Sequence, residues 1–374
     1  MKEKICIVVS SAMTVNAFLL EPIIKLSKHY HVSIVVNDTS ENISEKLGNL
    51  TILTVPIVRK ISPFHDLFTL YKLIRIFRAN HFKAVHSVTP KAGLLAMLAS
   101  FFAGVSTRIH IFTGQVWVTH SGLSRFVFKL MDRLIASFST DILVDSASQR
   151  QFLLDERVVN SVKSSVLAKG SISGVNTARF KPDKPTRSKL RQELAINERD
   201  VVFLFIGRLN RDKGVLDLAT AFSKIKDNRA HLLIVGPDEV GIQPEMELLL
   251  GNSLERVNFI GFSSQPEEYM AAADVLCLPS YREGFGSVVI EAAAVGIPTV
   301  GSRIYGVEDA IADGHSGLLF QAGNVEELLI QMMKFLSDNE LGKSLGANAR
   351  KRVLAQFSSE TLATAWLDYY QARI

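Results

Sequence analysis

Glu283-Gly-Phe-Gly-Ser-Val-Val-Ile-Glu291 places two carboxylates eight residues apart around a glycine-rich turn. The preceding run, Ala273-Asp-Val-Leu-Cys-Leu-Pro-Ser280, has the composition of a short buried strand, and residues 287–294 have that of a helix beginning after Gly286. Backbone amides at a helix N-terminus carry partial positive charge, so a strand that feeds such a turn favours anion binding. The stretch therefore predicts an α/β fold with a diphosphate site at this turn.

The residues of this turn divide into contacts of different kinds. Gly286, with Phe285 and Ser287 on either side, lets the backbone come close to a diphosphate. Glu291 is one to two helical turns further on and can reach ribose hydroxyls, which leaves Glu283 for a sugar. Two glutamates also occur at this spacing by chance, and a carboxylate near a helix start often serves only the helix dipole.

Apolar runs alternate with helical patterns at the spacing of β-α-β units, so the sequence predicts helix-covered parallel sheets. The alternation restarts after a basic stretch at residues 179–188 that has the composition of a surface linker. Two such halves would bind ligands at the carboxyl ends of their strands. The predicted strands cover residues 5–9, 32–36, 52–55, 84–87, 108–112, 201–206, 231–235, 257–260, 275–278 and 299–300, and helices are predicted at 16–27 and 62–80.

Composition agrees with an ordinary folded protein of two domains, since 374 residues with 47% hydrophobic content can form two sizeable cores. Cys6 and Cys277 lie in apolar runs of different halves, so we expect reduced core residues and a reducing cytoplasm. The N-terminal apolar run is too short for a signal peptide. The apolar stretch at residues 92–105 falls short of the roughly 20 residues of a membrane-spanning helix.

Several motifs together resemble the retaining glycosyltransferases of family 4, which have the GT-B fold. They are the stretch from Glu283, the segments Phe205-Ile-Gly-Arg208-Leu-Asn-Arg-Asp-Lys213-Gly214 and Asp313-Gly-His-Ser-Gly-Leu-Leu-Phe320, and the crossover at residues 170–180. The resemblance implies two Rossmann-like domains whose parallel sheets face across a cleft. It implies an acceptor domain at residues 1–170, a nucleotide-sugar domain at 171–356, and a C-terminal helix at about 357–374 that packs back on the first.

In that family an Arg and a Lys in the positions of Arg208 and Lys213 grip the donor diphosphate, and Glu283 holds the donor sugar. Fixed cations aimed at a leaving group stabilise the transition state. Without the resemblance, Arg208 and Lys213 would be read as solvated loop charges. The sequence has no Asp-x-Asp motif, and its His and Cys residues show no metal-ligand spacing, so we expect no cofactor and no metal requirement.

The first half holds the candidate acceptor residues. Arg108-Ile-His110-Ile-Phe-Thr-Gly-Gln-Val-Trp117 resembles a subgroup that extends lipid-diphosphate-linked glycans, which implies that His110 lies near the transferred sugar and that Thr113 and Gln115 contact the acceptor. A lone His on a strand can equally be a satisfied core residue. Thr89-Pro-Lys-Ala-Gly93 has a capping residue and Pro at the first helical position, so we expect Lys91 and nearby amides to bind an acceptor diphosphate.

The first half is also the basic one. Residues 1–180 hold 21 Lys plus Arg against 11 Asp plus Glu, a net charge of +10 in a chain whose total is +5. Tyr71-Lys-Leu-Ile-Arg-Ile-Phe-Arg78 has the pattern of a surface-lying helix that anionic lipid would attract, or of a solvated helix on a core element. Nucleic acid is not expected as a partner, since no binding module is recognisable.

These observations predict a retaining hexosyltransferase, which moves an N-acetylated hexose from a UDP-sugar to a polyprenyl-diphosphate-linked glycan of O-antigen or capsule. We expect it at the inner face of the cytoplasmic membrane. Two alternatives remain open: a UDP-sugar epimerase of the same fold, and a non-catalytic sugar-lipid binding protein. A NAD dehydrogenase is disfavoured, because no Gly-x-Gly-x-x-Gly follows the first strand.

Overall fold

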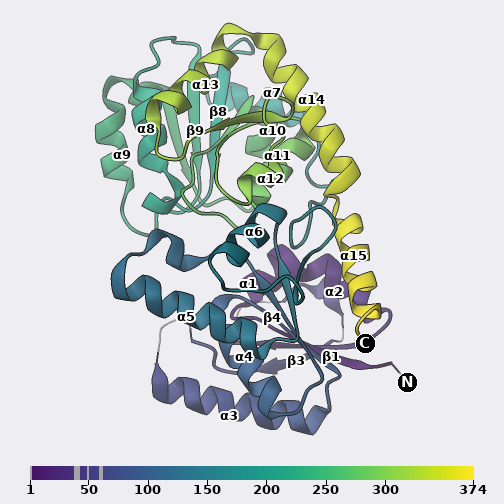
Figure 1. Cartoon of the computed structure of the whole chain (residues 1–374). Coiled ribbons are helices and arrows are strands. Elements are labelled where there is room, and N and C mark those ends of the chain that lie inside the picture. The colour runs from purple at the N-terminus through teal and green to yellow at the C-terminus, as the bar shows by residue number, and fades with distance from the viewer. Residues whose placement is uncertain (1, 38–42, 49, 59–61) are drawn as a thin grey trace. The chain divides into compact units, whose positions relative to one another are not determined.

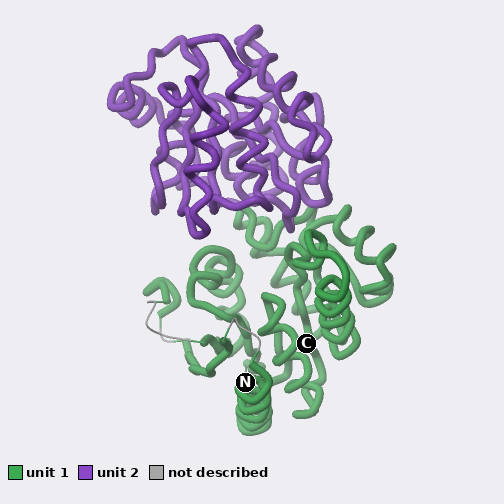
Figure 2. Tube along the Cα trace, turned by 90° about the vertical axis from the view of Figure 1, so that its left-hand side faces the viewer, with its two compact units in different colours: residues 1–174, 359–374 green, residues 175–358 purple. Residues whose placement is uncertain are grey.

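The computed structural model describes residues 2–37, 43–48, 50–58 and 62–374 (Figure 1). The chain forms two compact units, each with its own core (Figure 2). Unit 1 comprises residues 1–174 and 359–374, and unit 2 comprises residues 175–358. The sequence predicts the change of unit at residue 170 and the return at about 357, so the observed limits lie a few residues further along the chain.

Unit 1 is built on a sheet of seven strands, in which every neighbouring pair is parallel. Along β1, Ile5 and Ile7 pack on one face of the sheet, and Cys6 and Val8 pack on the other. Both faces are therefore covered, which explains the unbroken apolar runs in the sequence. In sheet order the strands are β3 (Thr51–Thr54), β2 (His31–Val36), β1 (Lys4–Val8), β4 (Ala84–Val88), β5 (Thr107–Phe112), β6 (Asp141–Val144) and β7 (Ser164–Val166).

The helices of unit 1 form two layers. One layer contains α3, α4 and α5, with α4 in contact with both neighbours, and the other contains α2 and the C-terminal α15. Their bounds are α1 (Ala12–Thr14), a π-helical turn (Val15–Leu19), α2 (Leu20–Ser27), α3 (Pro63–Asn80), α4 (Pro90–Phe102), α5 (Gly122–Phe138), α6 (Ala147–Asp155) and α15 (Ser359–Gln371). Single 3-10 turns cover Glu45–Leu47 and Val116–Thr119.

Unit 2 has a sheet of six parallel strands. In sheet order they are β10 (Val257–Gly261), β9 (Ala230–Val235), β8 (Val201–Ile206), β11 (Val275–Leu278), β12 (Thr299–Ser302) and β13 (Gly317–Phe320). The helices are α7 (Lys184–Glu193), α8 (Val215–Ser223), α9 (Gln243–Leu250), α10 (Pro266–Ala272), α11 (Ser287–Val295), α12 (Val307–Ala310), α13 (Val325–Ser337) and α14 (Asn339–Gln356), with 3-10 turns at Arg211–Lys213 and Gly251–Arg256. The predicted class, α/β with two Rossmann-like domains of parallel sheets, is confirmed.

The predicted linker at residues 179–188 is partly wrong, because α7 begins inside it. Asp183 accepts a hydrogen bond from the amide of Thr186 (3.1 Å), and Pro185 lies in the first turn. An acidic cap followed by Pro is a helix start as well as a loop composition. Cys6 and Cys277 are buried and form no disulfide, as predicted. Within the described ranges no helix is both long and apolar enough to cross a membrane.

Candidate active site

The candidate donor site of unit 2 lies where the strand order reverses. The chain leaves β8 for β9 and β10 on one side of the sheet and later returns to β11 on the other side of β8. Loops that follow β8 and β11 therefore leave the same carboxyl edge side by side, which is where open α/β sheets bind ligands. These loops carry Arg208, Lys213 and Glu283.

Lys213 and Glu283 meet at this edge although 70 residues separate them in the chain. The Nζ atom of Lys213 lies 2.5 Å from Oε1 of Glu283, and the buried hydroxyl of Ser280 donates to the same oxygen over 2.8 Å. Both partners are mostly shielded from water. Among the described residues Oε2 of Glu283 has no hydrogen-bond partner, so the fixed carboxylate keeps one oxygen for a ligand hydroxyl.

The N-terminus of α11 adjoins this pair. Gly286 is its N-cap, with φ at 73° in the left-handed region that other residues avoid, and no side chain caps the helix. The amide of Val289 donates to the carbonyl of Gly286 (2.8 Å), so it is the amides of Ser287 and Val288 that need another acceptor, and phosphate oxygens suit them. Phe285, assigned to the site from the sequence, instead turns its side chain into the core against Phe357, so only its backbone can contact a ligand.

Arg208 and Arg282 add positive charge around the same loops. Arg208 is largely exposed, and its one ion pair among the described residues is a long contact, 3.4 Å, to Glu239. Arg282, which the sequence analysis does not single out, lies against Asp212 at 3.4 Å, and its Nε is buried without a partner in the described part of the chain. The sequence feature that could have identified Arg282 is its position directly before Glu283. Ser280 was also missed, because a serine at the end of a strand has no distinctive pattern.

Glu291 lies on the second turn of α11 and is half-buried. Burial raises the pKa of its carboxyl group to about 7, against the opposing attraction of Arg179. Arg179 itself is held by Glu267 at 2.7 Å. No side chain in the described parts of the chain hydrogen-bonds Glu291. Its carboxyl group therefore lies in a partly buried position without a hydrogen-bond partner from the fold. That is the arrangement expected of a group that accepts ligand hydroxyls.

His110 on β5 of unit 1 is buried, with 1% of its surface exposed. Its Nδ1 shares a hydrogen bond with Ser87 of the neighbouring β4 (2.8 Å), and a Cβ atom added at Gly93 would come within 2.4 Å of the imidazole ring. Burial lowers the pKa of His110 to about 3, so the ring is neutral. The structure thus gives His110 the contacts of a fixed core histidine close to the carboxyl edge of its sheet.

The loop after β5 is tied together by amide side chains. Gln115 is buried and donates to the carbonyl of Thr113 (2.8 Å), while Gln149 of α6 donates to the same carbonyl and to Oε1 of Gln115. The side chain of Gln115 therefore holds the loop from inside. Thr113, which is half-buried, is the better placed of the two predicted acceptor contacts.

The prediction that the side chain of Thr89 caps α4 is wrong, whereas the proline in the first turn of α4 is present as predicted. Thr89 has φ at 77° and its hydroxyl donates to Ser10 (3.2 Å) instead of capping the helix. Lys91 is held by Asp66 in the first turn of α3, with Nζ 2.7 Å from Oδ1. This partner lies 25 residues away, so local pattern could not reveal it.

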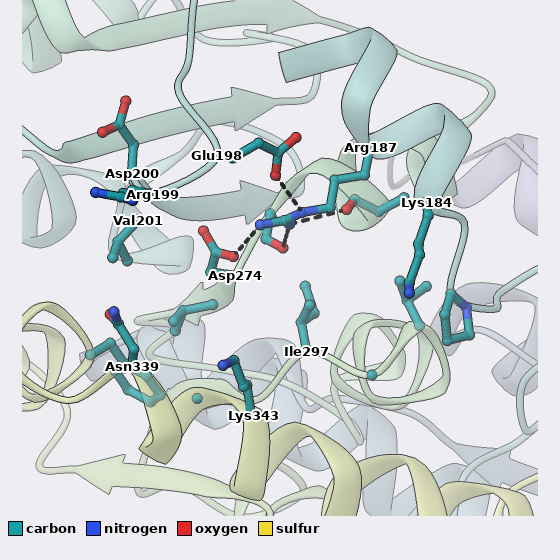
Figure 3. Close-up of a pocket in the computed structure, with 18 of the residues that line it drawn as sticks. Lys184, Arg187, Glu198, Arg199, Asp200, Val201, Asp274, Ile297, Asn339 and Lys343 are labelled. Atoms are coloured by element: carbon teal, nitrogen blue, oxygen red, sulfur yellow. Dashed lines mark hydrogen bonds and ion pairs between the residues drawn. The ribbon is translucent and has the colours of Figure 1, made fainter. Parts of the chain in front are cut away.

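A cavity of about 590 Å³ lies at the opposite, amino-terminal edge of the unit 2 sheet. Arg187 points into it and is held by Asp274 (2.7 Å) and by carbonyls at the end of α10 (Figure 3). Two carboxylates that line the cavity, Asp183 and Asp338, cap the N-termini of α7 and α14. These charges are used within the fold, so the donor motif and not the cavity marks the candidate site. Among the described residues, no three His, Cys, Asp or Glu side chains gather as metal ligands would.

Comparison with known proteins agrees with the two-unit organisation. Residues 186–352 match the family model described as glycosyl transferases group 1, and residues 4–146 match the model described as glycosyl transferase 4-like. The chain is 30% identical over 338 residues to the capsular polysaccharide biosynthesis glycosyltransferase CapM of Staphylococcus aureus, a match that covers 90% of this chain and 88% of that one.

A second relative is the N,N'-diacetylbacillosaminyl-diphospho-undecaprenol alpha-1,3-N-acetylgalactosaminyltransferase of Campylobacter jejuni, at 25% identity with 93% of each chain covered. Among solved structures, HepE of Anabaena in complex with UDP-glucose superposes with a TM-score of 0.82 at 20% identity and covers 99% of both chains. At that identity the superposition shows the shared fold.

Proposed function

This chain belongs to the group 1 glycosyl transferases, and on that basis we propose that it moves an N-acetylated hexose from a UDP-sugar to a polyprenyl-diphosphate-linked glycan in bacterial surface polysaccharide synthesis. The names of two relatives support this substrate class. One acts in capsular polysaccharide biosynthesis, and the other transfers N-acetylgalactosamine to a diphospho-undecaprenol-linked sugar. A structural neighbour binds UDP-glucose.

The observation that carries the proposal is the joint placement of Lys213, Glu283 and the uncapped N-terminus of α11 at one edge of the sheet. A departing nucleoside diphosphate gains negative charge in the transition state. Lys213, Arg208 and the first amides of α11 supply fixed positive charge there, while Glu283 holds the donor sugar through its second oxygen. Glu291 accepts hydrogen bonds from the ribose.

We assign a retaining, same-face course to the transfer. The bond between the anomeric carbon and the diphosphate oxygen breaks, and the acceptor hydroxyl oxygen forms the new bond to that carbon. The hydroxyl proton passes to the departing phosphate oxygen, so no separate base is required. Neutral His110, whose Nδ1 is taken by Ser87, positions a sugar hydroxyl through its other ring nitrogen, Nε2, and Lys91 with Thr113 holds the acceptor.

We further propose that the reaction needs no divalent metal, because the two basic side chains and the α11 amides occupy the charge-neutralising role. Saturating EDTA should leave the rate within about twofold of the untreated enzyme. A loss of activity that Mg²⁺ or Mn²⁺ restores would contradict this assignment.

The function is tested by mixing the purified protein with UDP- and GDP-sugars, with and without a polyprenyl-diphosphate-linked sugar, and measuring nucleotide release and product mass. We expect acceptor-dependent UDP release and a product heavier by one N-acetylhexosamine residue. A changed nucleotide sugar without acceptor would establish an epimerase. Binding without turnover across a panel of acceptor glycans would indicate a non-catalytic sugar-lipid binding protein.

Because such an acceptor is anchored in lipid, we propose a peripheral position at the cytoplasmic face of the membrane. The net charge of +10 on residues 1–180 supports attraction to anionic lipid.

A further inference from the structure

Helix α5 turns its apolar side toward solvent. Leu123, Phe126, Val127, Leu130 and Leu134 are all exposed, Leu123 by 78% and Phe126 by 61%. At about 100° per residue these positions fall on one stripe roughly 100° wide. The buried positions Asp132, Ile135 and Ala136 lie on the opposite side. A helix that only covers a core has the reverse arrangement, with its apolar stripe inward.

Helix α3 repeats this arrangement. Phe64, Leu67, Phe68 and Tyr71 are exposed at helical spacing, Phe64 by 91%. The helix is anchored from its other side by Thr69, Leu73 and Phe77, which are buried. Further along, Arg75 and Arg78 continue the same outward stripe, so its first half is apolar and its second half is cationic.

The two stripes belong to one helix layer. Helix α4 lies between α3 and α5 and packs against both (Figure 1). The end of α4 adds Phe101 and Phe102, which are about half exposed. Eleven of the 25 exposed large apolar side chains in the described parts of the chain lie on these three helices. Exposed apolar surface gathered in this way marks an interaction surface.

The charge beside the α5 stripe is positive. Arg125, Lys129 and Arg133 follow one another at four-residue spacing along its flank, and a single carboxylate, Glu156, serves both Arg125 and Lys129. Within the described residues Arg133 donates to backbone carbonyls and to no carboxylate, so its charge is not neutralised. With Arg157 and Lys163 it lines a cavity of about 400 Å³, and the described lining residues include no carboxylate.

We propose that the outward stripes of α3 and α5 form a docking surface for an anionic lipid bilayer, with the apolar side chains in the interfacial region and the basic flank on the headgroups. An apolar stripe bordered by cations is the pattern of helices that lie in a membrane interface. Each basic residue near an anionic surface adds to the attraction. The inference rests on the proposed function, since only a lipid-anchored acceptor gives the surface its purpose.

The ion pair between Lys91 and Asp66 connects this surface with the proposed acceptor site. Asp66 lies in the first turn of α3, on the side of the helix that faces away from the exposed Phe64, Leu67 and Phe68. A polyprenyl diphosphate has its phosphates at the bilayer interface, so a docked α3 brings Lys91 to that depth. A second copy of the chain is a poorer occupant, because a symmetric contact would set the cationic flanks of both copies against each other.

The test is binding of the full chain to vesicles, followed by flotation. The vesicles contain phosphatidylcholine alone or with about one third phosphatidylglycerol. One variant carries Leu123→Ser, Phe126→Ser and Leu130→Ser, and another carries Phe64→Ser, Leu67→Ser and Phe68→Ser. A control carries Val240→Ser, Leu248→Ser and Phe262→Ser, which are similarly exposed side chains of unit 2.

We expect binding to the anionic vesicles that falls at least tenfold in the α3 and α5 variants, stays within twofold in the control, and weakens with salt. Wild-type-like vesicle binding by both stripe variants would overturn the proposal. So would a concentration-dependent dimer in sedimentation that the α5 changes abolish while no vesicle binding is seen.

Sugar transfer to a short-chain, water-dispersed prenyl-diphosphate acceptor without vesicles separates this inference from the proposed function. The stripe variants should retain the wild-type rate in that assay, because their changes lie outside the catalytic machinery. If the wild-type protein floats with anionic vesicles but transfers no sugar to any acceptor, the proposed function fails while the docking surface stands.

Discussion

Lys213 and Glu283 depend on each other at the donor site, because each lies mostly out of solvent and the pair is joined at 2.5 Å. Glu283→Gln and Lys213→Ala should each lower kcat by about 10²- to 10³-fold, since fixed charges at a developing leaving group contribute that much. Steady-state kinetics with saturating donor gives the measurement. Lys213→Arg should restore part of the rate.

The matched control is Lys224→Ala, which breaks an exposed pair with Glu326 in the same unit. Its kcat should stay within twofold of wild type. If Glu283→Gln also turns over at the wild-type rate, Glu283 has no part in the mechanism.

Glu291 makes the stability of unit 2 depend on pH. Its pKa of about 7 lies above the ordinary 4.5, so the folded state keeps a proton that the unfolded state releases between these values. The free energy of unfolding therefore falls as pH rises from 4.5 to 7, and the loss is complete above pH 7. Glu291→Gln removes this loss, so it should stabilise unit 2 at pH 8 by up to about 3 kcal/mol and leave pH 5 nearly unchanged.

Thermal melting at both pH values checks this, with the exposed Glu340→Gln as control. Equal effects of Glu291→Gln at pH 5 and pH 8 would refute the assigned pKa shift. UDP affinity should fall in the same variant, because Gln offers the ribose hydroxyls one neutral acceptor oxygen in place of a carboxylate. Glu291 thus lowers the stability of unit 2 above pH 7 while it strengthens donor binding.

At the scale of elements, the joint between α3 and α4 tests the acceptor site. Lys91→Ala should raise the KM for the lipid-linked acceptor about tenfold or more, the amount expected for a charged hydrogen bond. Asp66→Asn removes a carboxylate that pairs with Lys91 and would repel the acceptor phosphates. This variant should therefore lower the KM for the acceptor severalfold. Acceptor titration at fixed donor measures both.

Lys83→Ala, an exposed position before β4, serves as control and should leave the KM unchanged. An unchanged KM in Lys91→Ala would remove this lysine from the acceptor site. If Asp66→Asn raises the KM instead, Asp66 acts by orienting Lys91.

The sequence predicts the central strands of both sheets within about one residue, because strands buried on both faces are unbroken apolar runs bounded by turn residues. β8 and β11 match their predicted limits. The prediction is wrong where the same composition is compatible with two structures. At residues 184–188 a proline and charged residues are typical of a loop, but they are also typical of the first turn of a helix, and the structure has a helix there. Contacts such as Lys213 with Glu283 and Lys91 with Asp66 join distant segments, so only the fold reveals them.

At the scale of the whole molecule, unit 1 is completed by the last helix of the chain. Trp366 of α15 donates to the carbonyl of Ile172 (2.9 Å) and stacks on His86, and Tyr370 shares a hydrogen bond with His86 (2.8 Å). Trp366→Ala should therefore destabilise unit 1 by about 3 to 5 kcal/mol, as for other fully buried aromatic side chains.

Amide hydrogen exchange measures the loss of protection separately in unit 1 and in unit 2. Amides of β1, β2 and β4 should lose protection in Trp366→Ala, while those of β8 and β11 keep it. Asp368→Ala, an exposed position on the same helix, should behave like wild type. Equal loss in both units would show that they unfold together.

The interrupted course of unit 1 also bears on how the protein is made. Residues 1–174 leave the ribosome first, but their core lacks Trp366 and Tyr370 until residues 175–358 have been synthesised. At elongation rates of about 5–20 residues per second, that delay is roughly 10 to 40 seconds. Unit 2 can fold within this interval, whereas the nascent unit 1 exposes apolar surface that chaperones recognise. A truncated translation product would remain in that unfinished condition and be a substrate for proteolysis.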